Sequence, residues 1–187
     1  MINDTYFFQE LPLLFDKVVT FSMILAFAYH AVAKVVLKKV NNLSLIITSG
    51  LVTASYAMSS YLYSFNELIN LYLLWIIYDA ELIFLLWALH KLLKIEHTYS
   101  FIYVCLGLVC NSCLYALIYI DRNIVGTNEV WWFWYFYSTA IKVFDALIII
   151  ALFTNKDFLK LSVLKQALTK RFGSKKCLVK EQSEPQI

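Results

Sequence analysis

Two acidic residues near the middle of an apolar stretch have side chains that could do chemistry. The stretch runs from Leu71 to Leu89, and Asp79 and Glu81 lie near its centre. A carboxylate at the centre of a bilayer costs about 2.5–3.5 kcal/mol, so such a residue usually has a partner or a function. Successive residues of a helix are rotated by about 100°, which separates the two acids by about 200°. This geometry argues against a paired general acid and base.

The last apolar segment carries a second set of charges. Lys142 and Asp145 are three residues apart, so they can pair within one helix. Tyr135 and Ser138 extend the same face, which we expect to point into the protein or a water-filled space. We also predict that one acid of the Leu71–Leu89 stretch reaches Lys142 across a helix contact. The other acid then needs a proton, hydroxyl groups, water or a neighbouring subunit.

The buried-charge network that the sequence predicts holds more acid than base. Its members are Asp79, Glu81, Asn111, Lys142 and Asp145. A carboxyl group that loses its hydration becomes neutral rather than stay charged without a partner. We therefore expect at least one of the three acids to be protonated at neutral pH. The network could fix the register of the helices, conduct protons or ions, or switch its pairing when the membrane is perturbed.

The elements that position these residues are expected to be transmembrane helices. The chain has 187 residues, of which 61% are hydrophobic and only 16% are charged. Its apolar residues form runs long enough to cross a bilayer. We predict an all-α polytopic membrane bundle over residues 1–154, with about five transmembrane helices. The expected spans are residues 17–37, 43–63, 68–93, 100–120 and 130–154.

Small residues mark a helix-packing face in the second span. Ser49, Gly50, Thr53 and Ala57 recur at helical spacing and would let another helix approach closely. The face could pack within the subunit or between subunits. Glycine and proline are otherwise scarce, which argues against the broken helices of secondary transporters.

The cysteines and histidines do not form a convincing metal motif. Cys105, Cys110 and Cys113 lie in one apolar segment without a histidine, so we interpret them as small buried hydrophobes. No catalytic constellation accompanies them. We therefore expect no metal, no cofactor and no enzymatic activity.

The lysines predict the orientation in the membrane. Lys38 and Lys39 follow the first span, and Lys91 and Lys94 follow the third. The positive-inside rule then places the N-terminus outside and the C-terminus in the cytoplasm of a bacterial inner membrane. This arrangement requires an odd number of spans. A four-span alternative would make the first apolar run re-entrant or interfacial.

Residues 155–187 are expected to form a basic amphipathic helix and a mobile end in the cytosol. Its apolar residues recur every three or four positions. The expected docking residues are Lys156, Lys160, Lys165, Lys170 and Arg171. Such a helix can lie on anionic lipid headgroups or bind a cytosolic protein partner. We expect no direct contact with nucleic acid.

The size, the several spans, the buried charges and the basic cytosolic tail together resemble the membrane subunit of the Kiwa anti-phage defence system. The resemblance covers the general plan of the chain and assigns no site residues. It implies an oligomeric membrane sensor that holds a cytosolic DNA-binding effector and responds to phage attack.

The sequence therefore favours a non-enzymatic inner-membrane protein that senses membrane perturbation or anchors a cytosolic effector. A homo-oligomer is expected, because small bundles often bury polar faces between subunits. One alternative is an ion or proton channel, or a transport component, that uses Asp79, Glu81, Lys142 and Asp145. Another is a toxin-immunity or holin-like membrane protein.

Overall fold

The chain is all-helical over the residues that the computed structural model describes, which are 2–36, 43–62, 70–127 and 129–157. Side chains are described from Leu14 in the first helix and as far as Ser59 in the second. The helices are α1 (Ile2–Val35), α2 (Leu43–Leu62), α3 (Leu71–Leu92), α4 (Tyr99–Tyr119) with a π-helical extension (Ile120–Ile124), and α5 (Trp132–Thr154). The predicted all-α membrane bundle is confirmed at this level.

Four of these helices are long and apolar enough to cross a membrane: Leu14–Val35 of α1, all of α3, Tyr99–Ile124 and all of α5. The described apolar part of α2 is Leu43–Ser59, because its side chains are described only as far as Ser59. The whole helix has 20 residues and is about 30 Å long at 1.5 Å per residue, which matches a hydrocarbon core of about 30 Å. The second predicted span, residues 43–63, therefore corresponds to α2, and its crossing of the bilayer stays a prediction.

Polar residues determine where three of these helices begin or end. Asn70 caps α3 by accepting a hydrogen bond from the Tyr72 backbone amide, and Thr98 caps α4 by accepting one from Phe101. Both residue types are preferred N-caps. Asn155 ends α5 in a left-handed conformation. The boundaries agree with the predicted spans within three residues, except that α1 begins at Ile2 rather than near residue 17.

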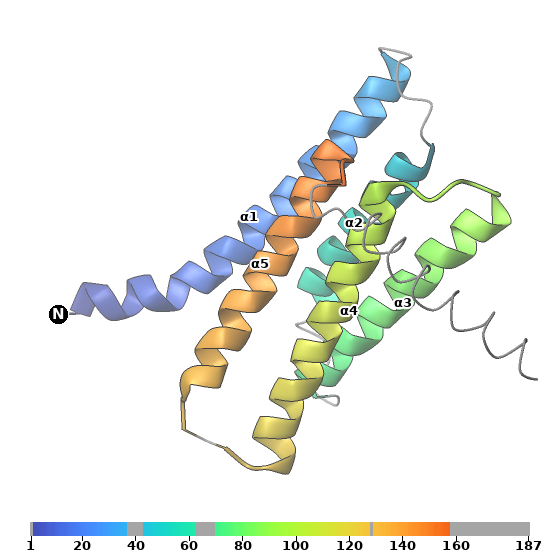
Figure 1. Ribbon diagram of the computed structural model, residues 1–187. Coiled ribbons are helices and arrows are strands. Elements are labelled where there is room, and N and C mark those ends of the chain that lie inside the picture. Colours follow the sequence, from blue (N-terminus) through green and yellow to red (C-terminus); the bar gives the residue numbers. More distant parts are fainter. Residues whose placement is uncertain (1, 37–42, 63–69, 128, 158–187) are drawn as a thin grey trace, which may run out of the picture. The chain divides into compact units, whose positions relative to one another are not determined.

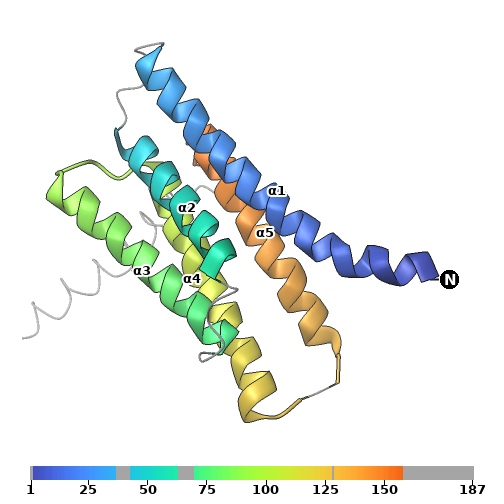
Figure 2. The same ribbon diagram turned by 180° about the vertical axis from the view of Figure 1, so that it is seen from behind.

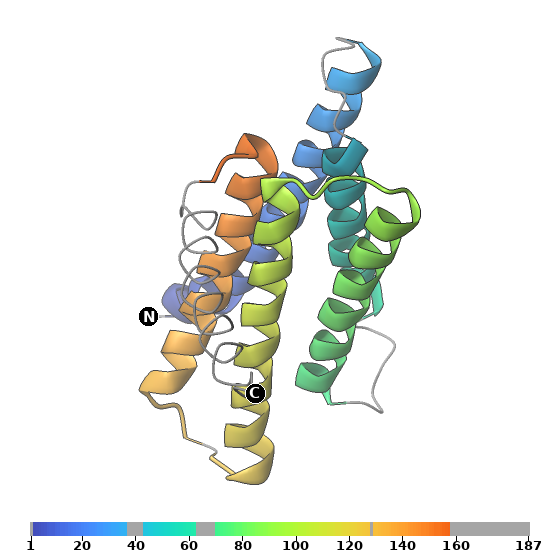
Figure 3. The same cartoon turned by 45° about the vertical axis from the view of Figure 1, so that its right-hand side comes forward.

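Helix α4 lies between α3 and α5, and these neighbours pack along its length (Figures 1 and 3). Helix α1 packs on α2 and α5, as Figure 2 shows from behind. The core joins Met23 of α1, Leu86 of α3, Leu108 of α4 and Leu152 of α5. Gly107 allows α4 and α5 to approach, because a Cβ there would lie 2.7 Å from the Ile148 side chain.

The chain divides into two compact units, Met1–Asn155 and Lys156–Ile187. The predicted boundary lies between residues 154 and 155. Most of the second unit is outside the described residues, so its amphipathic helix and its docking role stay predictions. Of its predicted docking residues, only Lys156 is described, and it is exposed. Lys160, Lys165, Lys170 and Arg171 lie outside the described part of the chain.

The polar face predicted on α5 is not uniformly inward. Asp145 is buried and Lys142 is half-buried, whereas Tyr135 is 69% exposed and Ser138 is also exposed. The buried residues of α5 are confined to its second half, from Asp145 to Leu152. Of the two expected surroundings, the protein interior or a water-filled space, the interior is therefore wrong for Tyr135 and Ser138, because the first half of α5 packs less closely on its neighbours.

Candidate functional site

Asp145 of α5 is the centre of a buried polar cluster. Its Oδ1 atom accepts a hydrogen bond of 2.6 Å from the Tyr56 hydroxyl on α2 and one of 3.1 Å from Asn111 Nδ2 on α4. A hydroxyl and a carboxamide are neutral donors, so neither carries a charge to offset that of a carboxylate. Through these two hydrogen bonds, the carboxyl group of Asp145 links α5 to α2 and α4.

Asp79 of α3 joins the cluster through the next residue of α4. Ser112 Oγ donates to Asp79 Oδ2 over 3.2 Å, and Ser112 directly follows Asn111. The two carboxyl groups are also close enough for their charges to interact. Helix α4 thus carries one donor for each acid. We call Tyr56, Asp79, Asn111, Ser112 and Asp145 the carboxylate cluster.

The cluster contains one unused acceptor. Asn111 is buried, and its Oδ1 atom has no hydrogen-bond partner among the described residues. A buried acceptor without a hydrogen-bond donor lowers the stability of the fold by about 1–3 kcal/mol. A neighbouring group that carries a proton would donate to this oxygen and remove that cost. A protonated carboxyl group in the cluster is one chemically suitable donor.

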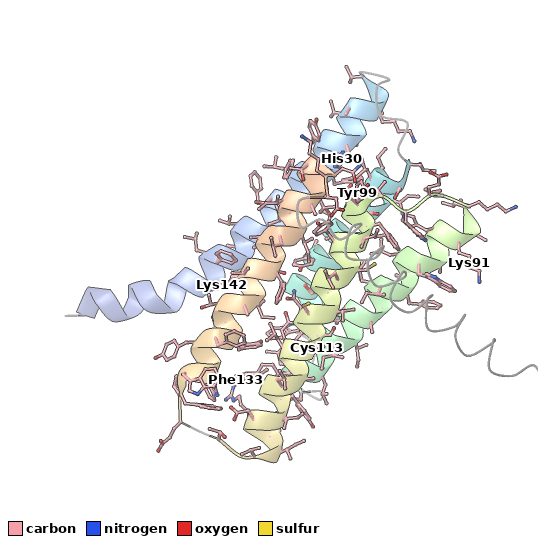
Figure 4. All side chains as sticks on the ribbon, viewed as in Figure 1. His30, Lys91, Tyr99, Cys113, Phe133 and Lys142 are labelled. Atoms are coloured by element: carbon pink, nitrogen blue, oxygen red, sulfur yellow. The ribbon has the colours of Figure 1, made fainter. Side chains whose placement is uncertain are left out.

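Lys142 and Glu81 are not part of this cluster. The Lys142 ammonium lies 5.3 Å from the centre of the Phe15 ring on α1, and its charge interacts with Asp16. Figure 4 places Lys142 where α1 and α5 meet. Glu81 is exposed on α3. The structure therefore brings together Asp79, Asn111 and Asp145 of the predicted network and leaves out its other two members.

Two predicted ion pairs are replaced by other contacts. The hydrogen-bond partners of Asp145 are Tyr56 and Asn111 rather than Lys142. The expected contact between an acid of α3 and Lys142 is also wrong within the chain, because α4 lies between α3 and α5 (Figure 3). Helical spacing alone does not tell which neighbours a helix has.

The small residues of α2 pack against α1. A Cβ at Gly50 would lie 3.1 Å from the Phe27 ring, and Thr53 Oγ1 donates to the Met23 carbonyl over 2.9 Å. Ser49 is buried and donates to the Leu45 carbonyl of its own helix. Ala57 is half-buried. Of the two roles considered for this face, Gly50 and Thr53 serve packing within the subunit.

A second polar cluster lies where α3 ends and α4 begins. His90 is buried, with Nδ1 2.8 Å from the Leu86 carbonyl and Nε2 2.8 Å from Ser44 Oγ. A carbonyl can only accept, so Nδ1 carries the hydrogen and a neutral ring accepts at Nε2 from Ser44. Ser44 Oγ also lies 3.1 Å from the hydroxyl of Thr98. These contacts tie α2 to α3 and to the start of α4.

The same end of the bundle joins α1 and α4 to α5. His30 Nε2 lies 2.8 Å from the Leu152 carbonyl, and Ser100 Oγ donates to the Ala151 carbonyl over 2.6 Å. Asn155 accepts from the backbone amide of Ser100 over 3.2 Å. We call these residues, with Ser44, His90 and Thr98, the histidine end.

At the opposite end of the bundle, aromatic side chains surround charged ones. The indoles of Trp131 and Trp134 both donate to Asp121, over 3.1 and 2.8 Å. Arg122 lies over the Trp134 ring and donates to the Tyr72 hydroxyl over 2.9 Å. Tryptophan beside charged residues is typical of the boundary between headgroups and hydrocarbon.

The sequence did not reveal the partners of the acids. Tyr56 interrupts a run of small residues on α2, and Ser112 stands beside the polar Asn111. These local signals exist, but pairing a tyrosine with an acid 89 positions later requires the tertiary fold.

The cysteines of α4 are less buried than predicted. Cys105 and Cys110 are half-buried, and Cys113 is exposed (Figure 4). Cys113 follows the exposed Val109 by one helical turn, so it lies on the outer face of α4. Within the described residues, no three His, Cys, Asp or Glu side chains are grouped so that they could hold a metal ion.

Comparisons with known proteins add no family to this description. No family model matches the chain, and no curated protein or solved structure matches it either.

Proposed function

We propose that the protein is a non-enzymatic component of the bacterial inner membrane that senses a perturbation of the bilayer and holds a cytosolic partner. The N-terminus would lie outside and the basic C-terminal segment in the cytosol, as the lysine distribution predicts. In this proposal the helix bundle is the sensor and residues 155–187 are the binding segment.

The observation that supports a sensor is the way in which Asp145 joins three helices. Its described hydrogen bonds come from neutral groups on α2 and α4, and no described partner is a lysine or arginine. Hydrogen bonds between membrane helices are worth about 0.6 kcal/mol on average and at most about 1.7 kcal/mol. Tension, thinning or a change in membrane potential that shifts α5 by a fraction of a helical turn could therefore break the contact.

The decisive experiment is affinity purification of the full chain and of a truncated chain from the same membranes. The truncation should follow Lys156, because Asn155 ends α5 and accepts from Ser100. We expect one stoichiometric cytosolic protein with the full chain and its loss from the truncated chain. A charge-reversed tail, with glutamate in place of Lys160, Lys165, Lys170 and Arg171, should lose it as well.

The matched control reverses Lys91 and Lys94, which lie on the same predicted side but outside the tail. This variant should keep the partner. Osmotic shock or an ionophore should release the partner from the full chain, and Asn111→Leu should change the threshold for release. Equal recovery of the protein with the full and truncated chains would refute the anchoring role.

A proton or ion pathway is the second candidate, because Asp79 and Asp145 lie close enough to interact electrostatically. The unused Asn111 acceptor lies in the same cluster. Reconstituted liposomes should then show a proton flux that Asp79→Asn or Asp145→Asn abolishes while the protein stays folded. A flux no greater than that of empty liposomes would exclude this candidate.

A further inference from the structure

Glu81 lies on a face of α3 that the described part of the chain does not cover. Its carboxylate is exposed, and so are Ile77, Phe84 and Leu85, which lie three or four residues away on the same side. This face is apolar apart from the one acid. A carboxylate that faces hydrocarbon at this depth requires a partner.

Among the basic residues of the described membrane-spanning helices, one lies as far along its helix as Glu81 does along α3. Lys17, Lys34, Lys91 and Arg122 all lie within three residues of the end of their apolar stretches. Only Lys142 has a central position along its helix: it lies ten residues after the start of α5, as Glu81 lies ten residues after the start of α3, and its long side chain reaches Phe15 of α1. Both helices run in the same direction, since each is antiparallel to α4 (Figure 1).

Within one chain α4 lies between α3, which carries Glu81, and α5, which carries Lys142 (Figure 3). Lys142 is half-buried and lies near Asp16 and Phe15, where α1 bends away from α5 towards its N-terminus (Figures 1 and 2). A second chain could approach the junction of α1 and α5 with its α3 face.

We propose that Glu81 of one copy pairs with Lys142 of a neighbouring copy, with the exposed face of α3 packed against α1 and α5 of that neighbour. The contact joins two different surfaces, so it is heterologous. A heterologous contact between copies in one membrane plane produces a ring where its rotation closes. The inference does not depend on a cytosolic partner, and its failure would leave the proposed function untouched.

Thiol cross-linking in membranes tests this pairing with the full chain. Cys105, Cys110, Cys113 and Cys177 are first replaced by alanine, and two differently tagged chains are expressed together. We expect a chain carrying Glu81→Cys to cross-link to one carrying Lys142→Cys through a short bifunctional reagent. Control chains carry the cysteine at the adjacent exposed position, as Ala80→Cys in place of Glu81→Cys or Val143→Cys in place of Lys142→Cys. Each control pair should give at least tenfold less cross-linked product.

A charge exchange provides the second measurement. Glu81→Lys should lower the oligomer fraction in lipid nanodiscs at least tenfold, and adding Lys142→Glu should restore it. The proposal fails if Glu81→Cys chains cross-link mainly to each other, or if the exchanged pair does not recover. It also fails if no cross-link forms in the full chain but one forms after truncation following Lys156, because the tail would then cover this face.

Discussion

Asp145 and Glu81 are both acids near the middle of an apolar helix, yet their surroundings are opposite. Asp145 is buried and accepts hydrogen bonds from α2 and α4. Glu81 is exposed on α3 among apolar side chains. The first acid therefore helps to determine how one chain packs. The second takes no part in the packing of the described residues, which leaves it for other contacts.

This difference teaches that the depth of a charge does not define its role. Asp79 lies two residues before Glu81, and rotation by about 200° turns it towards Ser112 of α4. The helix thus carries one acid for the interior of the bundle and one for its surface. Substitutions at the two kinds of acid should consequently affect different measurements.

The largest effect is expected from Asp145→Leu. It removes two interhelical hydrogen bonds and leaves the buried Asn111 amide without its described acceptor, at a cost of about 2–4 kcal/mol. The measurement is unfolding by sodium dodecyl sulfate in mixed micelles, followed by circular dichroism. Glu81→Leu, the matched control, should leave this stability unchanged while it alters the oligomer. Equal destabilisation by both variants would remove the distinction between the two acids.

Gly107→Ala should cause the second-largest loss of stability, because it disturbs the packing of the same α4–α5 contact. The added methyl would lie 2.7 Å from two carbons of Ile148, and overpacking of this kind costs about 1–3 kcal/mol. Ile148→Ala in the same chain should recover part of the loss. Gly50→Ala should cost less, since its closest contact is 3.1 Å to the Phe27 ring. The same unfolding assay would contradict the packing if Gly107→Ala were neutral.

A smaller effect is expected from Tyr56→Phe, which removes one donor to Asp145 at a cost of about 0.6–1.7 kcal/mol. Ser44→Ala removes the donor to His90 at the histidine end, with a similar cost. The two sites are twelve residues apart on α2, or about 18 Å along the axis, so their effects should add within about 0.5 kcal/mol. A larger interaction energy in the double-variant cycle would show that the two clusters are coupled.

The last prediction concerns protons rather than stability. At least one of Asp79 and Asp145 should be protonated at neutral pH, because the described hydrogen-bond partners of both acids are neutral and Asn111 Oδ1 lacks a described donor. Infrared spectroscopy should show a protonated carboxyl band that Asp79→Asn or Asp145→Asn removes. A spectrum in which both acids are ionised would refute this prediction.

The sequence was sufficient to predict the helices but not their neighbours. Apolar runs of about 20 residues place the helices, and residues such as Asn70 and Thr98 mark their starts, because both signals act within a few residues. The same local reasoning failed for Lys142, which it paired with acids of the same chain. Which helices are adjacent depends on contacts between residues far apart in the sequence.

By itself, the sequence determined that this chain forms apolar membrane-type helices with acids near their centres. Hydrophobicity and helical period are local properties, so they can be read from residue order alone. Only the tertiary structure decided that Asp145 meets Tyr56 and Asn111, whereas Glu81 stays on the surface. The reason is that the insertion of α4 between α3 and α5 separates Glu81 from Lys142 and brings Asp145 to donors on two other helices.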